Sequence, residues 1–160
     1  MAKLYLIGIA SHYEYKKEYC KAAVSTGAKE VFIEEMNNDW HDSLQKKMYK
    51  ELIENNLKLI PIAPKEKIKL DTDGLSFVEL YYALNIKKNL ENKDYCFTIG
   101  SAHLCPKEKD ESPLEFALKA IGCDIEVLCN NFLKDYPLGY EKIINQRKKI
   151  ISHLIQGMHL

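Results

Sequence analysis

Two strand-like apolar runs in this chain end in a glycine followed by a histidine. The run KLYLIGIASH ends in His12, and the run YCFTIGSAH ends in His103. A third apolar run, VFIEE, ends in the adjacent acids Glu34 and Glu35. Buried parallel strands read as unbroken apolar runs, and ligands of such sheets bind at the carboxyl ends of the strands. If the three runs are neighbours in one sheet, two imidazoles and a carboxylate meet in one crevice.

Strand-like and helix-like segments alternate along the whole sequence. The apolar runs predict strands at residues 3–10, 30–33, 57–63, 94–100 and 124–129. The helical spacing of apolar residues and the Gly and Pro boundaries predict helices at 11–26, 40–55, 75–90, 113–121 and 140–155. This alternation predicts a single α/β domain over residues 1–160. Its sheet should be mainly parallel and doubly wound, with about five strands and helices on both faces.

The composition is that of an ordinary soluble globular protein. The 23 basic and 23 acidic residues cancel, so nothing in the net charge favours nucleic acid or an anionic membrane as a partner. The basic residues include one arginine, Arg147, which argues against a surface built for many bidentate phosphate or guanine contacts. No apolar stretch approaches the roughly 20 residues that span a bilayer.

The cysteines and the N-terminus favour a reducing compartment. The five cysteines are odd in number and lack CxxC spacing, so a secreted disulfide framework is not expected. The first residues show no signal-peptide pattern, and we expect a cytoplasmic protein. Cys96 and Cys129 lie in apolar runs and are predicted to be buried small hydrophobes.

The histidines and acids at the strand ends are the candidate site. His12, His103 and one of Glu34 and Glu35 could hold a divalent metal such as Mn, Co or Zn with an open position for water. Without a metal, the same groups could act as general base and acid. Alternation along a strand sends Glu34 and Glu35 to opposite sides, so only one can face the crevice. The alternative is that each residue simply ends a strand.

Three of these segments also resemble a known superfamily. LIGIASH ending in His12, VFIEEM containing Glu34 and Glu35, and FTIGSAHL containing His103 are similar to motifs of the TraB/Tiki and erythromycin-esterase/ChaN-like superfamily. The resemblance extends over residues 3–129 and rests on few fixed residues. Its members include metal-dependent proteases, esterase-like enzymes and haem-binding proteins. The resemblance therefore implies a hydrolytic, metal-dependent site on the residues that match.

The sequence departs from that superfamily in two places. Three residues separate the glycine of the first motif from His12, as in the esterase-like form. Where the protease-like branch carries an Arg-Asn pair, this chain has Lys88-Asn89, and lysine does not replace a bidentate arginine. Lys88 is a candidate for orienting the site residues through hydrogen bonds without itself binding the metal or substrate. Glu14, in the first helical turn after His12, is a second candidate for this role.

Two functional classes follow. The first is a metal-dependent or histidine-assisted hydrolase, peptidase-like or esterase-like, that acts on a small molecule or a peptide. The second is a non-catalytic α/β module that binds a small ligand or a partner protein. The polar loops at 64–74 and 105–113 follow strand ends and could close over the site.

Two weaker expectations complete the sequence analysis. Cys105 could serve as a thiol nucleophile with His103 or His12 as its base. The apolar stripe of the C-terminal helix, 140–155, is expected to pack in the core, with an interface to a second copy of the chain as the alternative.

Overall fold

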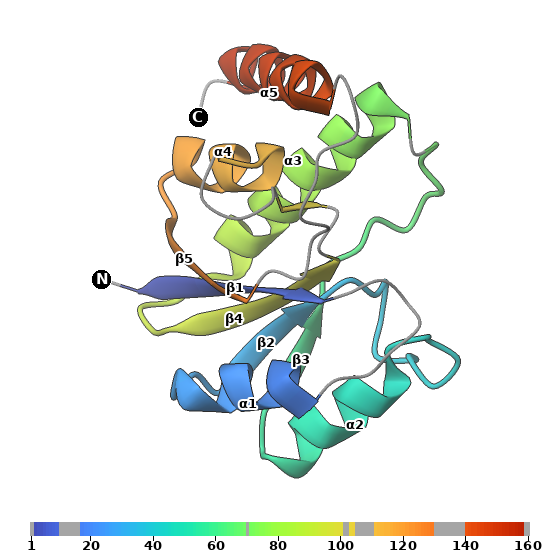
Figure 1. The fold of residues 1–160 in the computed structure, drawn as a ribbon, viewed down its shortest axis with the longest axis vertical. Helices are drawn as coiled ribbons and strands as arrows, with labels where there is room; N and C mark the ends of the chain where they lie inside the picture. The colour runs from blue at the N-terminus through green and yellow to red at the C-terminus, as the bar shows by residue number, and fades with distance from the viewer. Residues whose placement is uncertain are drawn as a thin grey trace.

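The computed structural model describes residues 2–9, 17–69, 71–100, 103–104, 111–129 and 140–158 (Figure 1). The strands are β1 (Lys3–Ile9), β2 (Glu30–Ile33), β3 (Lys58–Pro61), β4 (Tyr95–Gly100) and β5 (Asp124–Cys129). The helices are α1 (Lys17–Ser25), α2 (Lys46–Glu54), α3 (Thr72–Asn89), α4 (Pro113–Ala120) and α5 (Tyr140–Gln156).

The five strands form one parallel sheet in the order β3-β2-β4-β1-β5. Because β4 lies between β1 and β2, the three strands whose ends carry the predicted residues are neighbours. Thr98 of β4 is level with Ile7 of β1 on one side and with Ile33 of β2 on the other. The predicted α/β fold with a parallel five-stranded sheet is therefore confirmed.

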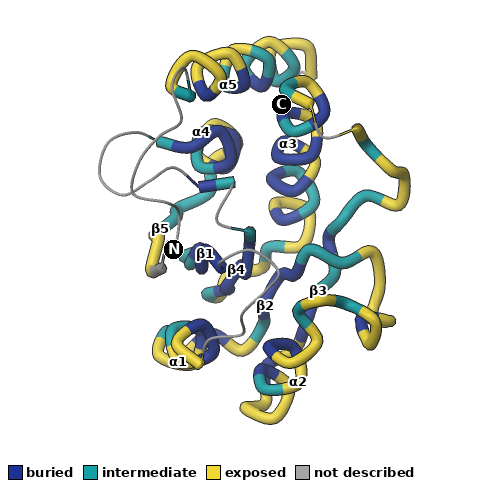
Figure 2. The backbone as a smooth tube through the Cα atoms, turned by 45° about the vertical axis from the view of Figure 1, so that its right-hand side comes forward, coloured by how far each residue is buried: buried dark blue, intermediate teal, exposed yellow. Residues whose placement is uncertain are grey.

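The helices cover both faces of this sheet. Helices α1 and α2 lie on one face, and α3 and α4 lie on the other, with α5 above α3 and α4 and away from the sheet (Figures 1 and 2). Side chains alternate between two buried clusters: Leu6 and Phe32 pack with α3 and α4, whereas Ile7 and Ile33 pack with α1 and α2. This alternation decides the side to which each residue beyond a strand end points.

One predicted helix begins later than its sequence suggests. A helix was expected over 40–55, but α2 starts at Lys46 and residues 37–45 are irregular, with bends and turns. Asn37 Oδ1 accepts a hydrogen bond from the Asp39 backbone N–H at 2.8 Å, a turn geometry that competes with a helix start. The apolar periodicity of 40–55 predicted a buried stripe with Leu44, Met48, Leu52 and Ile53, of which Leu44 and Ile53 are exposed.

Another helix begins earlier than predicted. The polar segment 64–74 was expected to be a loop, but α3 starts at Thr72, where Asp71 Oδ1 accepts from the Gly74 backbone N–H at 2.8 Å. A Cβ at Gly74 would collide with the backbone carbonyl of Lys69, so this position requires glycine. An aspartate at the N-cap accepts a hydrogen bond from a backbone N–H of the first helical turn, which has no partner within the helix.

The other predicted boundaries that fall on described residues hold within a few residues, and the predicted start of the first helix, at residue 11, lies outside them. Gly27 and Gly122 follow α1 and α4 with positive φ angles of 76° and 93°, as expected of glycines that end helices. Pro113 occupies the start of α4, and Ser112 caps it by accepting from the Glu115 N–H at 3.1 Å.

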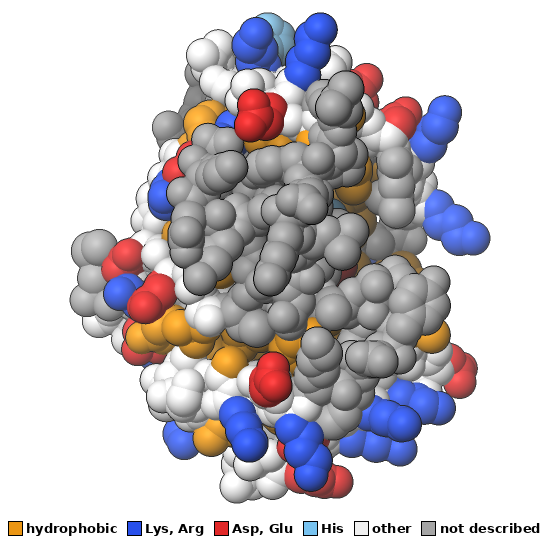
Figure 3. Space-filling model, in the orientation of Figure 1, with side chains coloured by type: hydrophobic (Ala, Val, Ile, Leu, Met, Phe, Trp, Pro, Cys, Tyr) orange, Lys and Arg blue, Asp and Glu red, His pale blue; other side chains and the backbone are white. Residues whose placement is uncertain are grey.

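The surface mixes charges of both signs. Basic and acidic side chains lie interspersed around the margin of the face shown in Figure 3. Among the described helices, none combines the length and the apolar character that crossing a bilayer requires. Cys96 is fully buried, as predicted, and the Cys129 side chain lies outside what the structure describes.

Candidate functional site

The two acids beyond β2 point to opposite sides of the sheet. Glu34 continues the side of Phe32, facing α3, and Glu35 continues the side of Ile33, facing α2. Their partners follow this division, since Glu34 interacts with Tyr82 of α3 and Glu35 with Ser43 and Tyr49. The structure thus places one acid, Glu34, on the side where His103 lies.

Glu34 receives hydrogen bonds from both the sheet and α3. Its Oε1 accepts from the backbone N–H of Gly100, the last residue of β4, at 2.6 Å. It also accepts from the hydroxyl of Tyr82. Burial first, and then the Glu34 carboxylate, raise the pKa of Tyr82 above its ordinary value. Tyr82 therefore stays a neutral donor, and Glu34 is fixed at the carboxyl end of β4.

His103 lies beside Glu34 across Gly100. A Cβ added to Gly100 would stand 3.7 Å from Glu34 Oε1 and 3.9 Å from His103 Cδ2, so both side chains border the same point. The ring of Tyr82 meets the His103 imidazole edge to face, with centroids 6.0 Å apart. The His103 side chain is 13% exposed, so it is largely but not completely buried.

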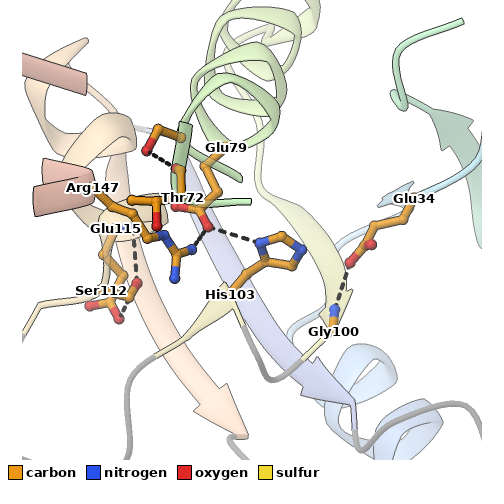
Figure 4. Close-up of polar contacts among 9 residues, drawn as sticks. Glu34, Thr72, Glu79, Gly100, His103, Ser112, Glu115 and Arg147 are labelled. Atoms are coloured by element: carbon orange, nitrogen blue, oxygen red, sulfur yellow. Dashed lines mark hydrogen bonds and ion pairs between the residues drawn. The ribbon is translucent and has the colours of Figure 1, made fainter. Parts of the chain in front are cut away.

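A buried carboxylate orients the His103 ring. His103 Nδ1 donates to Glu79 Oε1 at 3.0 Å, and Glu79 on α3 is completely buried. The other ring nitrogen, Nε2, points away from Glu79 toward the side where Glu34 and Gly100 lie (Figure 4). An imidazole held by a carboxylate at Nδ1 presents Nε2 as a proton acceptor or as a metal ligand.

His103, Glu79 and Arg147 of α5 form a buried row of polar side chains, in which each contacts the next. The Arg147 guanidinium forms an ion pair with Glu79 Oε1, the same oxygen that binds His103. Arg147 is 2% exposed, and burial lowers its pKa to about 10. Within the described part of the chain, Glu79 Oε2 and Arg147 Nε have no hydrogen-bond partner. The row thus joins α5, α3 and the end of β4 (Figure 4).

On the other side of the sheet, Glu35 has hydroxyl partners. Ser43 Oγ donates to Glu35 Oε1 at 2.5 Å, which ties the turn before α2 to the end of β2. Burial first, and then the carboxylates of Glu35 and Glu34, raise the pKa of Tyr49. Tyr49 in turn packs edge to face against Trp40. These contacts hold a turn against the sheet.

The remaining predicted residues lie elsewhere or outside the described ranges. His12, Glu14 and Cys105 fall in the segments 10–16 and 105–110, which the structure does not describe. Lys88 is exposed on the last turn of α3, at the edge where β4 begins. The structure therefore brings Glu34 and His103 together and leaves Lys88 at the opposite end of the strands.

The predicted metal ligands form only a partial set. Glu34 and His103 face one point, whereas Glu35 faces α2. Within the described ranges, no group of three His, Cys, Asp or Glu side chains is close enough together to hold a metal ion. A site with His12 as a further ligand lies outside those ranges. Of the described residues, His103 Nε2 and Glu34 could contribute to such a site.

Sequence reasoning missed Glu79, Arg147 and Tyr82 as site residues. A signal was present, because Glu79 lies on the apolar stripe of α3 and Arg147 lies between Ile144 and Ile151 on that of α5. A charged side chain on a buried helix face needs a partner of opposite charge. An acid and a base on the buried faces of two different helices are therefore expected to pair with each other.

The chain was compared with known proteins at three levels. No protein-family model, no curated protein and no solved structure matches it.

Proposed function

We propose that this protein is a histidine-assisted hydrolase that acts on a carbonyl or related bond in a small molecule or a peptide. His103 is its general base, Glu79 orients that base, and Glu34 borders the place where substrate and water meet. The site lies at the carboxyl ends of β2 and β4, where open α/β sheets bind their ligands.

The His103–Glu79 pair is the observation that carries this proposal. A general base needs a ring nitrogen that is free to accept a proton and a partner that fixes the other nitrogen. Glu79 supplies the partner at 3.0 Å and cannot turn away into solvent, because it is fully buried. The His103 side chain is not fully buried, being 13% exposed, so it can be reached from the surface.

Glu34 adds a carboxylate on the same side of the sheet. Two donors, the Gly100 N–H and the Tyr82 hydroxyl, hold it in place. A fixed carboxylate next to the base can accept a hydrogen bond from the attacking water or from an N–H of the substrate. The neighbouring Glu35 points to the other side of the sheet, toward α2. Only Glu34 therefore takes this role in the proposal.

The sequence resemblance supports the same class of reaction. The motifs around Glu34 and His103 resemble those of the TraB/Tiki and erythromycin-esterase/ChaN-like superfamily, in which metal-dependent hydrolysis occurs. We keep a divalent ion as part of the proposal to be tested. An imidazole that binds a metal commonly gives its other N–H to a carboxylate, as His103 does to Glu79.

The test is an activity screen of the purified protein. Ester, peptide and phosphoester substrates are assayed with Mn, Co or Zn added, and again after chelation. For the best substrate, His103→Asn should lower kcat/KM by about 100-fold or more, because a general base contributes roughly 10²–10⁴-fold. The matched control is His153→Asn, which removes an exposed imidazole on α5 and should leave kcat/KM unchanged.

Four outcomes separate the alternatives. Activity that survives chelation but not His103→Asn supports the metal-free base. Activity that chelation abolishes and a divalent ion restores supports a metal at the same site. Turnover of a substrate with the same kcat/KM in wild type and His103→Asn would contradict the proposal, and a protein that binds ligands at His103 without turnover would be the non-catalytic module.

A further inference from the structure

One side of α3 is exposed although it carries aromatic and apolar side chains. Phe77 and Tyr81 are 48% and 40% exposed, and the half-buried Leu84 lies on the next turn. Asp73 comes one turn before these residues and Lys88 one turn after them, and both are exposed. Residues at this spacing share one side of a helix, and we call this set the α3 stripe. Exposed positions recur along α3 in Figure 2.

The described part of the chain does not cover the α3 stripe. Asp73 and Lys88 form no ion pair with a described residue, and no described aromatic ring packs against Phe77 or Tyr81. The rest of α3 packs against α4, α5 and the sheet. Exposed apolar groups that adjoin one another and have charged residues at their margins are typical of a surface that binds another protein.

The charges at the two ends of the α3 stripe indicate which protein it binds. Asp73 lies in the first turn of α3 and Lys88 in the last. If two copies of α3 pack antiparallel about a two-fold axis at the middle of the stripe, Asp73 of one copy lies opposite Lys88 of the other. Phe77 then lies opposite Leu84, and the two Tyr81 rings flank the axis. The stripe is therefore complementary to itself in charge and in apolar content, as a two-fold interface requires.

Other arrangements of two copies fit less well. Parallel packing of two α3 helices would place like charges together at both ends of the stripe, which disfavours it. The C-terminal helix was the sequence-based candidate for an interface, but Ile144, Arg147 and Ile151 on its stripe are buried inside the fold. The antiparallel α3 pair is the arrangement that the exposed residues favour.

We propose that this protein forms a two-fold symmetric dimer in which the α3 stripes of two copies pack antiparallel. The stripe extends over about 22 Å of helix, at roughly 1.5 Å per residue. A contact between two helices of this length is at the small end of specific interfaces, so the dissociation constant should be micromolar. The opposite side of α3 carries Glu79 and Tyr82, so the dimer braces the helix that holds these residues of the candidate site.

Sedimentation equilibrium of the full chain over a range of concentrations tests the dimer. Truncating an aromatic anchor typically weakens an interface tenfold or more, and two-fold symmetry removes the anchor twice. Phe77→Ser should therefore raise the dimer Kd by about 100-fold. The matched control is Ile53→Ser on α2, which removes an apolar side chain that is 47% exposed on the other face of the sheet and should leave Kd unchanged.

A pair of charge variants tests the antiparallel arrangement. Asp73→Lys and Lys88→Asp each bring like charges together at both ends of the dimer, so each alone should have a Kd about tenfold higher than the wild type. In an equal mixture, one copy of each variant can pair so that opposite charges meet at both ends. The mixture should therefore associate with a Kd within about threefold of the wild type. Circular dichroism checks that every variant keeps its fold.

Three results would overturn the proposal. The first is a wild type that stays monomeric up to about 1 mM, which would leave the α3 stripe to a partner of another kind. The second is a Phe77→Ser protein that dimerises as strongly as Ile53→Ser. The third is a mixture of the charge variants that associates no more strongly than either variant alone. None of these measurements involves substrate, so the dimer and the proposed hydrolase stand or fall separately.

Discussion

The two sides of the sheet at the end of β2 differ in what they bury. On the α1 and α2 side, Glu35 is held by Ser43 near a packed core of apolar and aromatic residues. On the α3 to α5 side, the described chain buries Glu79 and Arg147 as a charged pair next to His103. Buried charges cost free energy that apolar packing does not. The first side is thus packed as apolar cores usually are, and the second carries a buried charge pair, which is the side on which we propose the chemistry.

The largest expected effect tests whether the charged pair is a stabilising feature. Arg147→Met removes the charged partner of the buried Glu79, which keeps only His103, and should lower the free energy of unfolding by about 3–5 kcal/mol. The double variant Glu79→Leu/Arg147→Met should be close to the wild type or more stable. Urea unfolding measures both, with Lys149→Met as the exposed control. A double variant as unstable as the single one would show that the pair itself stabilises the fold.

A smaller loss is expected on the other side of the sheet. Ser43→Ala removes the hydroxyl that donates to Glu35 at 2.5 Å and should cost about 2 kcal/mol, because hydrogen bonds to charged groups contribute roughly 1.5–3 kcal/mol. Urea unfolding measures this cost, and kcat/KM should not change. A loss of turnover in a stable Ser43→Ala protein would place chemistry on this side as well.

The smallest effect concerns alkaline pH. Burial raises the pKa of Tyr82, so this phenol stays neutral in the folded chain, whereas it ionises near pH 10 in the unfolded chain. The folded-state pKa lies above the unfolded one, so the stabilisation is fully present below pH 10 and is lost as the pH rises beyond it. Between pH 10 and 11 this group removes about 1 kcal/mol from the free energy of unfolding.

Tyr82→Phe isolates that contribution. The variant should lose stability less steeply than the wild type above pH 10, in urea unfolding at a series of pH values. Tyr81→Phe, which changes an exposed neighbour on the same helix, should follow the wild type. Parallel curves for wild type and Tyr82→Phe would mean that Tyr82 is not held neutral beside Glu34.

Much of the fold could be predicted from local sequence. The apolar runs predicted β2 and β5 to the residue, and the glycines predicted the ends of α1 and α4. Side-chain alternation predicted that Glu34 and Glu35 separate, since it depends only on strand geometry. The start of α2 was wrong because the side chains of Asn37 and Ser43 form local hydrogen bonds that apolar periodicity does not register.

The candidate site was harder to predict because it depends on contacts between distant helices. Glu79 and Arg147 are 68 positions apart and meet only after α5 packs on α3. Each looked like one polar residue on an apolar stripe. His103 was predicted as a site residue from its place after β4. Its partner Glu79 was not predicted, because a position at a strand end does not indicate which helix residue will contact it.

The most direct test of this account compares Glu34→Gln with Glu35→Gln. The two substitutions are identical in chemistry and one residue apart, and they fall on opposite sides of the sheet. On the best substrate from the screen, Glu34→Gln should lower kcat/KM by about 100-fold, a loss typical of a group that positions the reacting atoms, and Glu35→Gln should change it less than about threefold. Equal losses in the two variants, or a larger loss in Glu35→Gln, would contradict the assignment of chemistry to the α3 side.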